Sequence, residues 1–252
     1  MKVLFLTDAH LGSGSDTLQR ERELCQLLDK MKGDIDVLIL LGDLFDFWFS
    51  YRQVVPRGHT RFLGKLAELS DLGIEIHFFI GNHDMWIFDY LEKEMNVIMH
   101  DEPTMMEFDG KKLLIGHGDG LGHLDHRYDF LKKVFRCRLN QILFAMLPSS
   151  FTFGIANRWS NHSRHSHNPE VFQYLGDERE GIVLWCKEQL EKEPYDYCVF
   201  GHRHTPLQRT ITATNGNTST YINVGDWIVN RNYALLDNGK LTLYNLKENS
   251  SK

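Results

Sequence analysis

The chain has 252 residues and a formal net charge of −6 at pH 7; 42% of its residues are hydrophobic, 25% are charged and 12% are aromatic. This composition is typical of a globular protein in water. It excludes a membrane-spanning protein, which needs long uncharged apolar runs, and a disordered chain, which has few hydrophobic residues. A chain of this length can bury a large core, so we expect one domain over residues 1–252.

The start of the chain and its cysteines bear on where the protein works. The apolar stretch after Met1 is too short for a secretory signal and ends at Asp8. The four cysteines are scattered and include no C-x-x-C pair, so neither a disulfide framework nor a thiolate zinc site is expected. We therefore expect a cytoplasmic protein.

Charge is distributed unevenly along the chain. Between His126 and Arg164 there are seven basic residues and one acidic residue, a balance of +6, so the rest of the chain carries −12. A basic segment within an acidic protein favours the attraction of an anionic partner at that place. We expect no general affinity for nucleic acid.

The first half of the chain alternates between strand and helix patterns. Short apolar runs at residues 3–7, 37–41 and 74–80 are each followed by Gly or Asp, as buried parallel strands often are. Between them, residues 18–31 and 62–72 place apolar side chains at helical spacing. These βαβ units predict a parallel sheet with polar residues at the C-terminal ends of its strands.

The second half of the chain shows hairpin patterns. Residues 105–108 and 112–115 flank Asp109-Gly110, a pair that favours a type I′ turn. Further short strands are predicted near the C-terminus, at residues 197–200, 207–213, 219–223, 233–236 and 240–243. We therefore expect an α/β (α+β) fold with two stacked sheets, one largely parallel and one largely antiparallel, and with helices outside.

An insertion over about residues 121–168 interrupts this pattern. It predicts helices broken at Pro148, with an uncharged apolar face formed by Leu139, Ile142, Leu143, Met146 and Leu147. A segment of this length that combines Phe and Leu with Arg and Lys favours a helical lid over a site. The alternative is an ordinary pair of helices packed on the body.

Five short motifs follow predicted strands and carry most of the chemically active groups. They are Asp8-Ala9-His10, Gly42-Asp43-Leu44-Phe45-Asp46, Gly81-Asn82-His83-Asp84, Gly116-His117-Gly118-Asp119 and Gly201-His202-Arg203-His204. Because strand ends of an α/β sheet meet at one crevice, we expect their imidazoles, carboxylates and amide to converge. Such an inventory is typical of a two-metal hydrolytic site.

The types of candidate ligand limit which metals can bind. Asp8 and His10 are two residues apart, so on extended backbone both side chains point to the same face. The two oxygens of Asp43 can bridge two cations about 3.5 to 4 Å apart. Carboxylate, imidazole and amide ligands without thiolate suit Mn²⁺, Fe or Zn²⁺, and the residues do not choose among these metals.

The five motifs resemble those of the calcineurin-like metallophosphoesterase superfamily, and the resemblance covers the chain from Asp8 to His204. It implies two stacked mixed β-sheets flanked by helices, and a pair of divalent cations with Mn²⁺ expected. One cation would be held by Asp8, His10, Asp43 and His204, and the other by Asp43, Asn82, His117 and His202.

The same resemblance implies a mechanism of phosphoester hydrolysis. Two cations lower the pKa of a shared water, which attacks phosphorus in line while the cations take up charge on the phosphoryl oxygens. His83 would donate a proton to the leaving oxygen, and Asp84 would orient its ring. Asp46 and Asp119 would orient metal ligands rather than bind metal.

A narrower resemblance is to the UDP-2,3-diacylglucosamine diphosphatases of lipid A biosynthesis. It rests on Trp48 after the second motif, on the run from His117 to Asp125 and Tyr128, and on the basic and apolar insertion. It implies hydrolysis to UMP and 2,3-diacylglucosamine 1-phosphate by a peripheral protein at the cytoplasmic face of the inner membrane. The implied substrate contacts are Asn82, Asp125, Arg158, Ser163 and Arg164. The chain departs from this family at His83, where Arg is usual.

The composition of the insertion independently favours a substrate with lipid chains. Acyl chains need an apolar surface, and Phe130, Phe135, Leu143 and Phe144 are among the residues that offer one beside lysines and arginines. The same composition favours attraction to an anionic membrane. The alternative is that these residues only pack the insertion on the body.

Two other functions stay open on the sequence. His83 fits equally well a phosphoesterase acting on another monoester or diester, such as a soluble or cyclic nucleotide or a phosphoprotein, although the insertion fits that function poorly. A non-catalytic scaffold with this fold would have lost ligands, whereas all seven ligand positions are filled.

Overall fold

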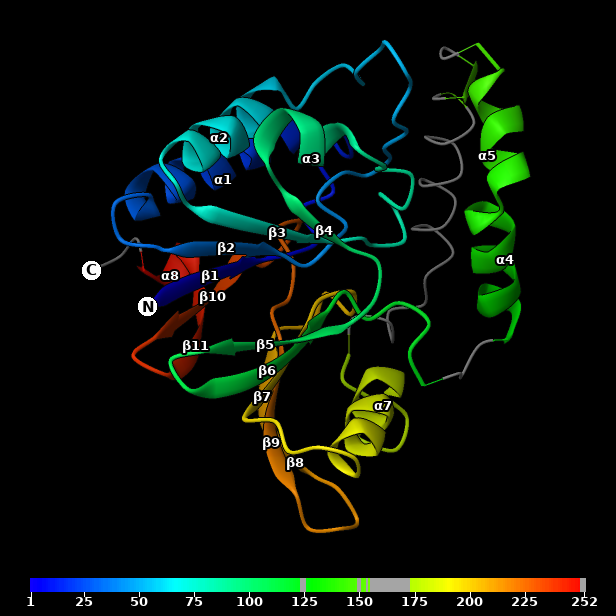
Figure 1. The fold of residues 1–252 in the computed structure, drawn as a ribbon. Helices are drawn as coiled ribbons and strands as arrows, with labels where there is room; N and C mark the ends of the chain where they lie inside the picture. The colour runs from blue at the N-terminus through cyan, green and yellow to red at the C-terminus, as the bar shows by residue number, and fades with distance from the viewer. Residues whose placement is uncertain (123–125, 149–150, 153, 155–172, 250–252) are drawn as a thin grey trace.

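Two stacked β-sheets form the body of the protein, and helices cover their outer faces (Figure 1). The structure is a computed structural model that describes residues 1–122, 126–148, 151–152, 154 and 173–249. The order of layers is helix, sheet, sheet, helix. This confirms the predicted α/β class with two mixed sheets.

The first sheet has six strands in the order β11-β10-β1-β2-β3-β4. They are β1 (Lys2–Leu6), β2 (Val37–Leu40), β3 (Glu75–Phe79), β4 (Ile98–His100), β10 (Asn232–Asp237) and β11 (Lys240–Asn245). Strands β1 to β4 run parallel, whereas β10 is antiparallel to both β1 and β11. The predicted strands and helices of the first half are therefore confirmed, and β4 is an additional edge strand that the sequence patterns did not indicate.

The second sheet has five strands in the order β5-β6-β7-β9-β8. They are β5 (Thr104–Phe108), β6 (Lys111–Gly116), β7 (Tyr197–Phe200), β8 (Leu207–Thr212) and β9 (Thr218–Asn223). Its central strands β6, β7 and β9 are parallel, and only the edges β5 and β8 are antiparallel to their neighbours. The prediction of a largely antiparallel second sheet is wrong, because β9 lies between β7 and β8 and separates strands that are consecutive in the sequence.

Three apolar clusters hold the layers together. Along β1, Val3 and Phe5 face the second sheet, while Leu4 and Leu6 face the helices of the first sheet, because successive side chains of a strand point to opposite faces. All four side chains are completely buried, which stabilises the fold by roughly 1.5 to 3 kcal/mol for each of them. The third cluster packs α7 against the second sheet.

The helices divide between the two sheets and the insertion. They are α1 (Thr17–Met31), α2 (Thr60–Asp71) and α3 (Tyr90–Met95) on the first sheet, α7 (Gly181–Leu190) on the second, α4 (His126–Arg136) and α5 (Arg138–Ala145) in the insertion, and the short α8 (Leu246–Asn249). Within the described residues, each helix is too short or too polar to cross a membrane.

An aromatic cluster packs the insertion on the body. The ring of Phe144 in α5 lies 4.5 Å from that of Trp86 and 5.1 Å from that of Phe49. Trp86 also donates a hydrogen bond from Nε1 to the carbonyl oxygen of Phe135, at 2.9 Å. The helices α4 and α5 are thus fixed to the body along this face, as the alternative of a packed helical pair predicts.

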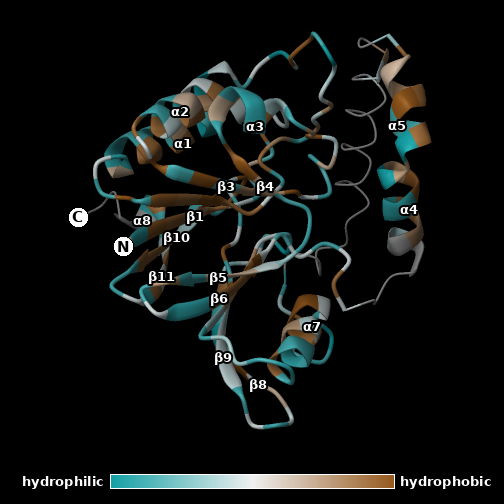
Figure 2. Ribbon diagram, viewed as in Figure 1, coloured by the Kyte–Doolittle hydropathy of each residue, from teal (hydrophilic) through white to brown (hydrophobic). Residues whose placement is uncertain are grey.

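The predicted apolar face, which the structure places on α5 and on the two residues that follow it, points elsewhere. The five predicted side chains are all exposed, from 39% to 77%: Leu139, Ile142, Leu143, Met146 and Leu147. Figure 2 shows hydrophobic residues along this outer helix. The insertion therefore has one apolar face that packs and a second one that is open to a ligand or a surface.

Candidate metal centre

The candidate ligands follow strands of both sheets. Asp8 and His10 follow β1, Asp43 follows β2 and Asn82 follows β3, whereas His117 follows β6 and His202 and His204 follow β7. Backbone hydrogen bonds join the loops: Asp8 N–H donates to Gly42 O at 3.1 Å, and Gly201 N–H to His117 O at 3.0 Å. The carboxyl ends of parallel strands thus bring the five motifs together, as the sequence predicts.

These loops turn sharply at the ligands themselves. Five of the seven candidate ligands have a positive φ: Asp8 (49°), His10 (42°), Asp43 (53°), His202 (66°) and His204 (55°). This left-handed conformation is unfavourable for residues with a Cβ, by roughly 1 kcal/mol or more each. The preceding glycines allow the loops to approach closely: a Cβ on Gly81 would lie 2.6 Å from Asp43 N, and one on Gly201 would lie 2.6 Å from Asp8 Oδ2.

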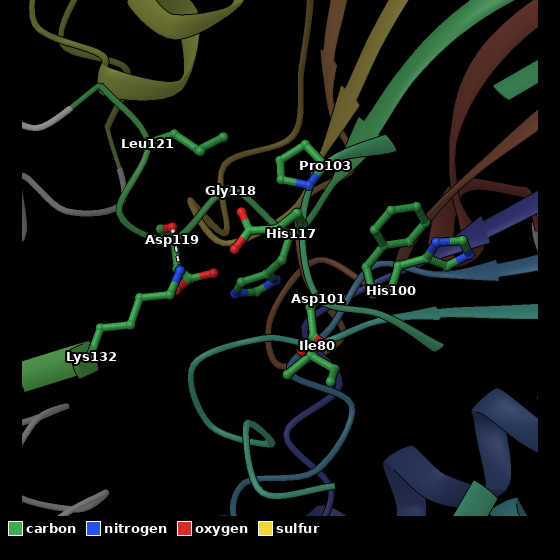
Figure 3. Close-up of a pocket in the computed structure, with 11 residues that line it drawn as sticks. Ile80, His100, Asp101, Pro103, His117, Gly118, Asp119, Leu121 and Lys132 are labelled. Carbon is green, nitrogen blue, oxygen red and sulfur yellow. Dashed lines mark hydrogen bonds and ion pairs between the residues drawn. The ribbon is translucent and has the colours of Figure 1, made fainter. Parts of the chain in front are cut away.

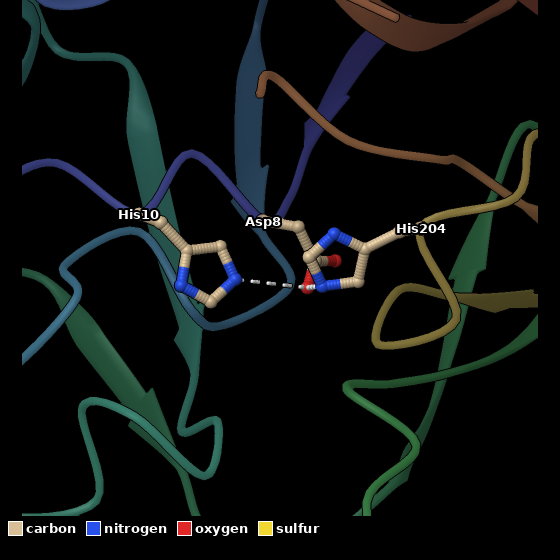
Figure 4. A group of neighbouring side chains, drawn as sticks. All are labelled: Asp8, His10 and His204. Atoms are coloured by element: carbon tan, nitrogen blue, oxygen red, sulfur yellow. Dashed lines mark ion pairs between the residues drawn. The ribbon is translucent and has the colours of Figure 1, made fainter. Parts of the chain in front are cut away.

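The first cluster consists of Asp8, His10 and His204 (Figure 4). Asp8 Oδ1 lies 3.2 Å from His204 Nε2 and 3.8 Å from His10 Nε2, and the two imidazole rings stack with centroids 5.1 Å apart. Asp8 and His10 are buried, and His204 is partly exposed. A carboxylate and two imidazoles that converge in this way are suitable ligands for a divalent cation.

The second cluster consists of Asp43, His117 and His202. Asp43 Oδ2 lies 3.5 Å from His117 Nε2, and Asn82 Oδ1 lies 3.2 Å from the same nitrogen. Asp43 Oδ2 is also 3.7 Å from His10 Nε2. Asp43 therefore lies between the two clusters, where a carboxylate could bridge two cations.

The second ring nitrogens of the histidines face other groups. His117 Nδ1 donates a hydrogen bond to Leu41 O at 2.6 Å, and His10 Nδ1 lies 3.4 Å from Asp46 Oδ1. Each contact directs Nε2 toward the clusters, which is how proteins orient histidines that bind metal. The prediction that Asp46 orients a ligand agrees with this contact.

The carboxyl groups of the clusters are negatively charged, as the binding of cations requires. Burial acts to raise the pKa of Asp8, but His204 and His10 hold it at about 2, so this carboxyl is ionised at neutral pH. Burial also opposes ionisation of Asp43, whose pKa nevertheless lies well below its usual value because of His117 and His83. Asp8 Oδ1 is buried and accepts no hydrogen bond within the described part of the chain. A buried, charged oxygen of this kind suits a divalent cation.

His83 lies beside the first cluster. Its ring centroid is 4.7 Å from that of His10, its side chain is 20% exposed, and its Nδ1 donates to Asp46 O at 3.0 Å. Burial lowers the pKa of His83 to about 4, so the ring is neutral at pH 7 in the free protein. A role as proton donor therefore requires that negative charge on a bound phosphoryl group raise this pKa.

Asp84 does not take the predicted position. Its carboxylate accepts hydrogen bonds from Leu44 N–H and Gly81 N–H, both at 2.9 Å, and the group that faces His83 Nδ1 is Asp46 O. The expectation that Asp84 orients the His83 ring is corrected accordingly. Asp84 joins the second and third motifs, because a buried carboxylate satisfies two backbone donors at once.

Asp119 connects the fourth motif to the insertion. Its Oδ2 accepts a hydrogen bond from Tyr128 at 2.8 Å and lies 2.7 Å from Lys132 Nζ, both on α4. Figure 3 shows Lys132 reaching Asp119 at a small cavity of about 20 Å³ beside His117, which has room for a single water. Asp119 thus holds α4 next to the candidate metal centre.

Most of the predicted substrate contacts cannot be placed. Asn82 lies beside the second cluster, with Oδ1 3.2 Å from His117 Nε2, whereas Asp125, Arg158, Ser163 and Arg164 lie outside the described residues.

The sequence motifs did not indicate two polar residues that lie near the clusters. Asp226 is buried, with Oδ2 3.8 Å from His204 Nδ1, and buried Arg20 donates to His10 O at 3.0 Å. Asp226 follows a strand as part of Gly225-Asp226, the pattern of Gly42-Asp43, so a signal for it existed. Arg20 lies on α1 and has no comparable signal.

Comparisons with known proteins agree with this geometry. The sequence profile of the family described as calcineurin-like phosphoesterase matches residues 1–206. The protein named UDP-2,3-diacylglucosamine hydrolase from Porphyromonas gingivalis (strain W83) is 37% identical in an alignment 261 positions long, gaps included, which covers 98% of each chain. The protein of the same name from Aeromonas salmonicida is 28% identical over 90% of this chain and 86% of its own length.

A solved structure of the Yfce phosphoesterase from E. coli also aligns. The alignment covers 96% of this chain and 91% of that chain, with a TM-score of 0.47 and 16% identity.

Proposed function

Because this chain belongs to the calcineurin-like phosphoesterase family, we propose that it is the hydrolase that cleaves UDP-2,3-diacylglucosamine to UMP and 2,3-diacylglucosamine 1-phosphate. The observation that carries the proposal is the 37% identity to a protein of that name along 98% of both chains. That alignment spans the insertion as well as the motifs. The substrate assignment is therefore supported by more than the groups that perform the reaction.

The seven ligands would hold a pair of divalent cations, for which we propose Mn²⁺. Asp8, His10 and His204 would hold one, Asn82, His117 and His202 the other, and Asp43 both. When bound, such cations supply a nucleophile at neutral pH and offset the charge on the phosphoryl group. Asp46 and Leu41 O orient the imidazoles, so the ligands need little rearrangement on binding.

His83 and the insertion would act on the substrate itself. The His83 ring lies beside the first cluster and is partly exposed. Once the charge of a bound phosphoryl group has raised its pKa and Nε2 is protonated, the ring can donate a proton or a hydrogen bond to a phosphoryl oxygen at that place. The open apolar face of α5 would contact the acyl chains. Four of the predicted substrate contacts lie outside the described part of the chain and would contact the polar head: Asp125, Arg158, Ser163 and Arg164.

The same face supports a peripheral association with an anionic membrane. Leu139 on α5 is 63% exposed and Met146, directly after this helix, is 77% exposed, while the basic side chains Lys133 and Arg138 lie on α4 and α5. Apolar insertion and basic attraction act together at the surface of an anionic bilayer. We propose that the protein works at the cytoplasmic face of the inner membrane.

One experiment separates this function from its alternative. The purified protein with Mn²⁺ is incubated with UDP-2,3-diacylglucosamine and, separately, with a panel of soluble nucleotides, and UMP and free phosphate are measured. We expect UMP from the lipid substrate and no comparable turnover of the nucleotides. Turnover of a nucleotide without UMP from the lipid would instead establish a phosphoesterase for soluble substrates.

A further inference from the structure

Arg203, the residue between His202 and His204, has no part in the function described so far. Its Nε lies 2.9 Å from Glu180 Oε2, and its Nη2 donates to Glu180 Oε1 at 3.1 Å. The pair therefore uses both carboxylate oxygens, which is the strong and directional form of an arginine–carboxylate interaction. Glu180 is only 4% exposed and immediately precedes α7.

Glu180 and its neighbour also contact both sides of the base of the insertion. On the C-terminal side, where the described chain resumes, Leu175 N–H donates to Glu180 Oε1 at 3.0 Å and Arg203 Nη2 donates to Gln173 O at 3.4 Å. On the N-terminal side, Gly122 lies so close to Gly181 that a Cβ on Gly122 would be 2.7 Å from Gly181 Cα. The two sides of the base meet at the start of α7.

The loop that carries the two histidines is held by other contacts. His202 N–H donates to Asp8 Oδ2 at 2.9 Å, Gly201 N–H donates to His117 O at 3.0 Å, and Asn230 Nδ2 donates to His204 O at 3.2 Å. The side chain of Arg203 is therefore not needed to fix the ligands. Its distinct contribution is to join their loop to the base of the insertion.

We propose that Arg203 and Glu180 are positioning residues that fix the base of the insertion relative to the candidate metal centre, in addition to the contacts of Asp119 with α4, and so determine specificity for the diacylated substrate. The inference rests on the proposed function, in which the substrate is held at its phosphates by the centre and at its acyl chains by the insertion. A substrate held at two places reacts only when both binding sites have the right separation. A displacement of the reacting atoms by about 1 Å can reduce the rate by about a hundredfold. A small phosphodiester contacts the centre alone and is insensitive to that separation.

Arg203→Gln and Glu180→Gln test the proposal by comparing two substrates. We expect each variant to lower kcat/KM for UDP-2,3-diacylglucosamine by about tenfold or more, and that for bis(4-nitrophenyl) phosphate by no more than about twofold. The double variant should resemble the single ones, because all three break the same pair. Equal losses on both substrates, or no loss on either, would overturn the proposal.

Two further measurements keep the outcome clear. Arg203→Lys retains the charge without the two-point geometry, so it should reproduce the selective loss even if Arg203→Gln folds poorly. Lys112→Gln is the matched control, because it breaks an exposed ion pair between β6 and Glu193, which follows α7, and should leave turnover of both substrates unaffected. Restoration of full activity on the lipid substrate by Arg203→Lys would contradict the need for a two-point pair.

Hydrogen exchange on the ligand-free protein needs no substrate. Exchange at the Leu175 amide should accelerate by about tenfold in Arg203→Gln, because the carboxylate that accepts this amide loses its partner. Unchanged exchange at Leu175 would overturn the inference whatever the substrate is. Failure of the wild-type protein to release UMP, with accelerated exchange in the variant, would refute the proposed function and leave the structural link between loop and insertion in place.

Discussion

His117 Nδ1 and Leu41 O are joined by a hydrogen bond of 2.6 Å that crosses from one sheet to the other. Leu41 directly follows β2 of the first sheet, and His117 directly follows β6 of the second. The bond turns His117 Nε2 toward Asp43 and Asn82, at 3.5 and 3.2 Å. The packing of the two sheets thereby determines the geometry of the candidate metal centre.

Removal of the carboxylate that lies between the two clusters should abolish metal binding. In Asp43→Ala, both proposed cations would lose a ligand, so we expect Mn²⁺ titration to show loss of the tight sites and UMP release to fall by about a thousandfold or more. Asp71→Asn, an exposed position on α2, is the control and should bind Mn²⁺ normally. Normal hydrolysis by the Asp43 variant would refute the two-metal interpretation.

Replacement of His83 should slow turnover while the metal content stays normal. His83→Ala removes no proposed ligand, and loss of a general acid reduces rates by about 10² to 10⁴-fold. If the ring acts as an acid, the loss should be larger for alkyl esters, which have poor leaving groups, than for 4-nitrophenyl esters. A uniform loss across leaving groups would identify His83 as a phosphoryl-binding group instead.

Charges on the open face of α5 should separate the two roles of the insertion. Leu143→Asp with Met146→Asp places two carboxylates on exposed positions, so we expect weaker binding to anionic vesicles and lower activity on the lipid substrate, with bis(4-nitrophenyl) phosphate turnover unchanged. Phe144→Ala is the contrasting variant. It removes the ring packed on Trp86, so we expect the free energy of unfolding to fall by about 3 kcal/mol and the melting temperature to fall with it. Retention of vesicle binding by the double Asp variant would locate the membrane contact elsewhere.

The carboxyl of Asp16 should contribute to stability only above acidic pH. Its partial burial acts to raise its pKa, but the hydrogen bond from Arg231 and the charge of Arg20 hold it below the usual value. A lowered pKa means that stabilisation is present above the unfolded pKa of 3.8 and is lost as the pH falls through the folded pKa. Because the side chain of Asp16 is 42% exposed and solvent screens its contacts, Asp16→Asn should cost only about 0.5 kcal/mol at pH 7. Urea unfolding at pH 7 and at pH 3.5 should show a smaller difference between wild type and variant at the lower pH; a constant difference would exclude an ionic origin.

Much of the fold could be predicted because its signals are local. Apolar runs followed by Gly or Asp locate β1, β2 and β3, and the pairs Asp109-Gly110 and Asn238-Gly239 have positive φ at both residues, as two-residue hairpin turns require. The helix α7 also had a signal, since Ile182, Val183, Cys186 and Leu190 have helical spacing.

What could not be predicted depends on distant contacts. The position of β9 between β7 and β8 is a matter of pairing across the sheet, which no local pattern encodes. Likewise, the contact of Asp84 with Leu44 N–H rather than with the neighbouring His83 ring depends on a loop 40 residues away in the sequence. Sequence motifs therefore indicate which groups gather, whereas tertiary packing decides which of them touch.

The left-handed backbone at five candidate ligands has a consequence for evolution. Glycine at Asp8, His10, Asp43, His202 or His204 would relieve an unfavourable conformation of roughly 1 kcal/mol at each place. Selection for thermal tolerance alone should therefore enrich glycine there and yield robust proteins that no longer hydrolyse their substrate.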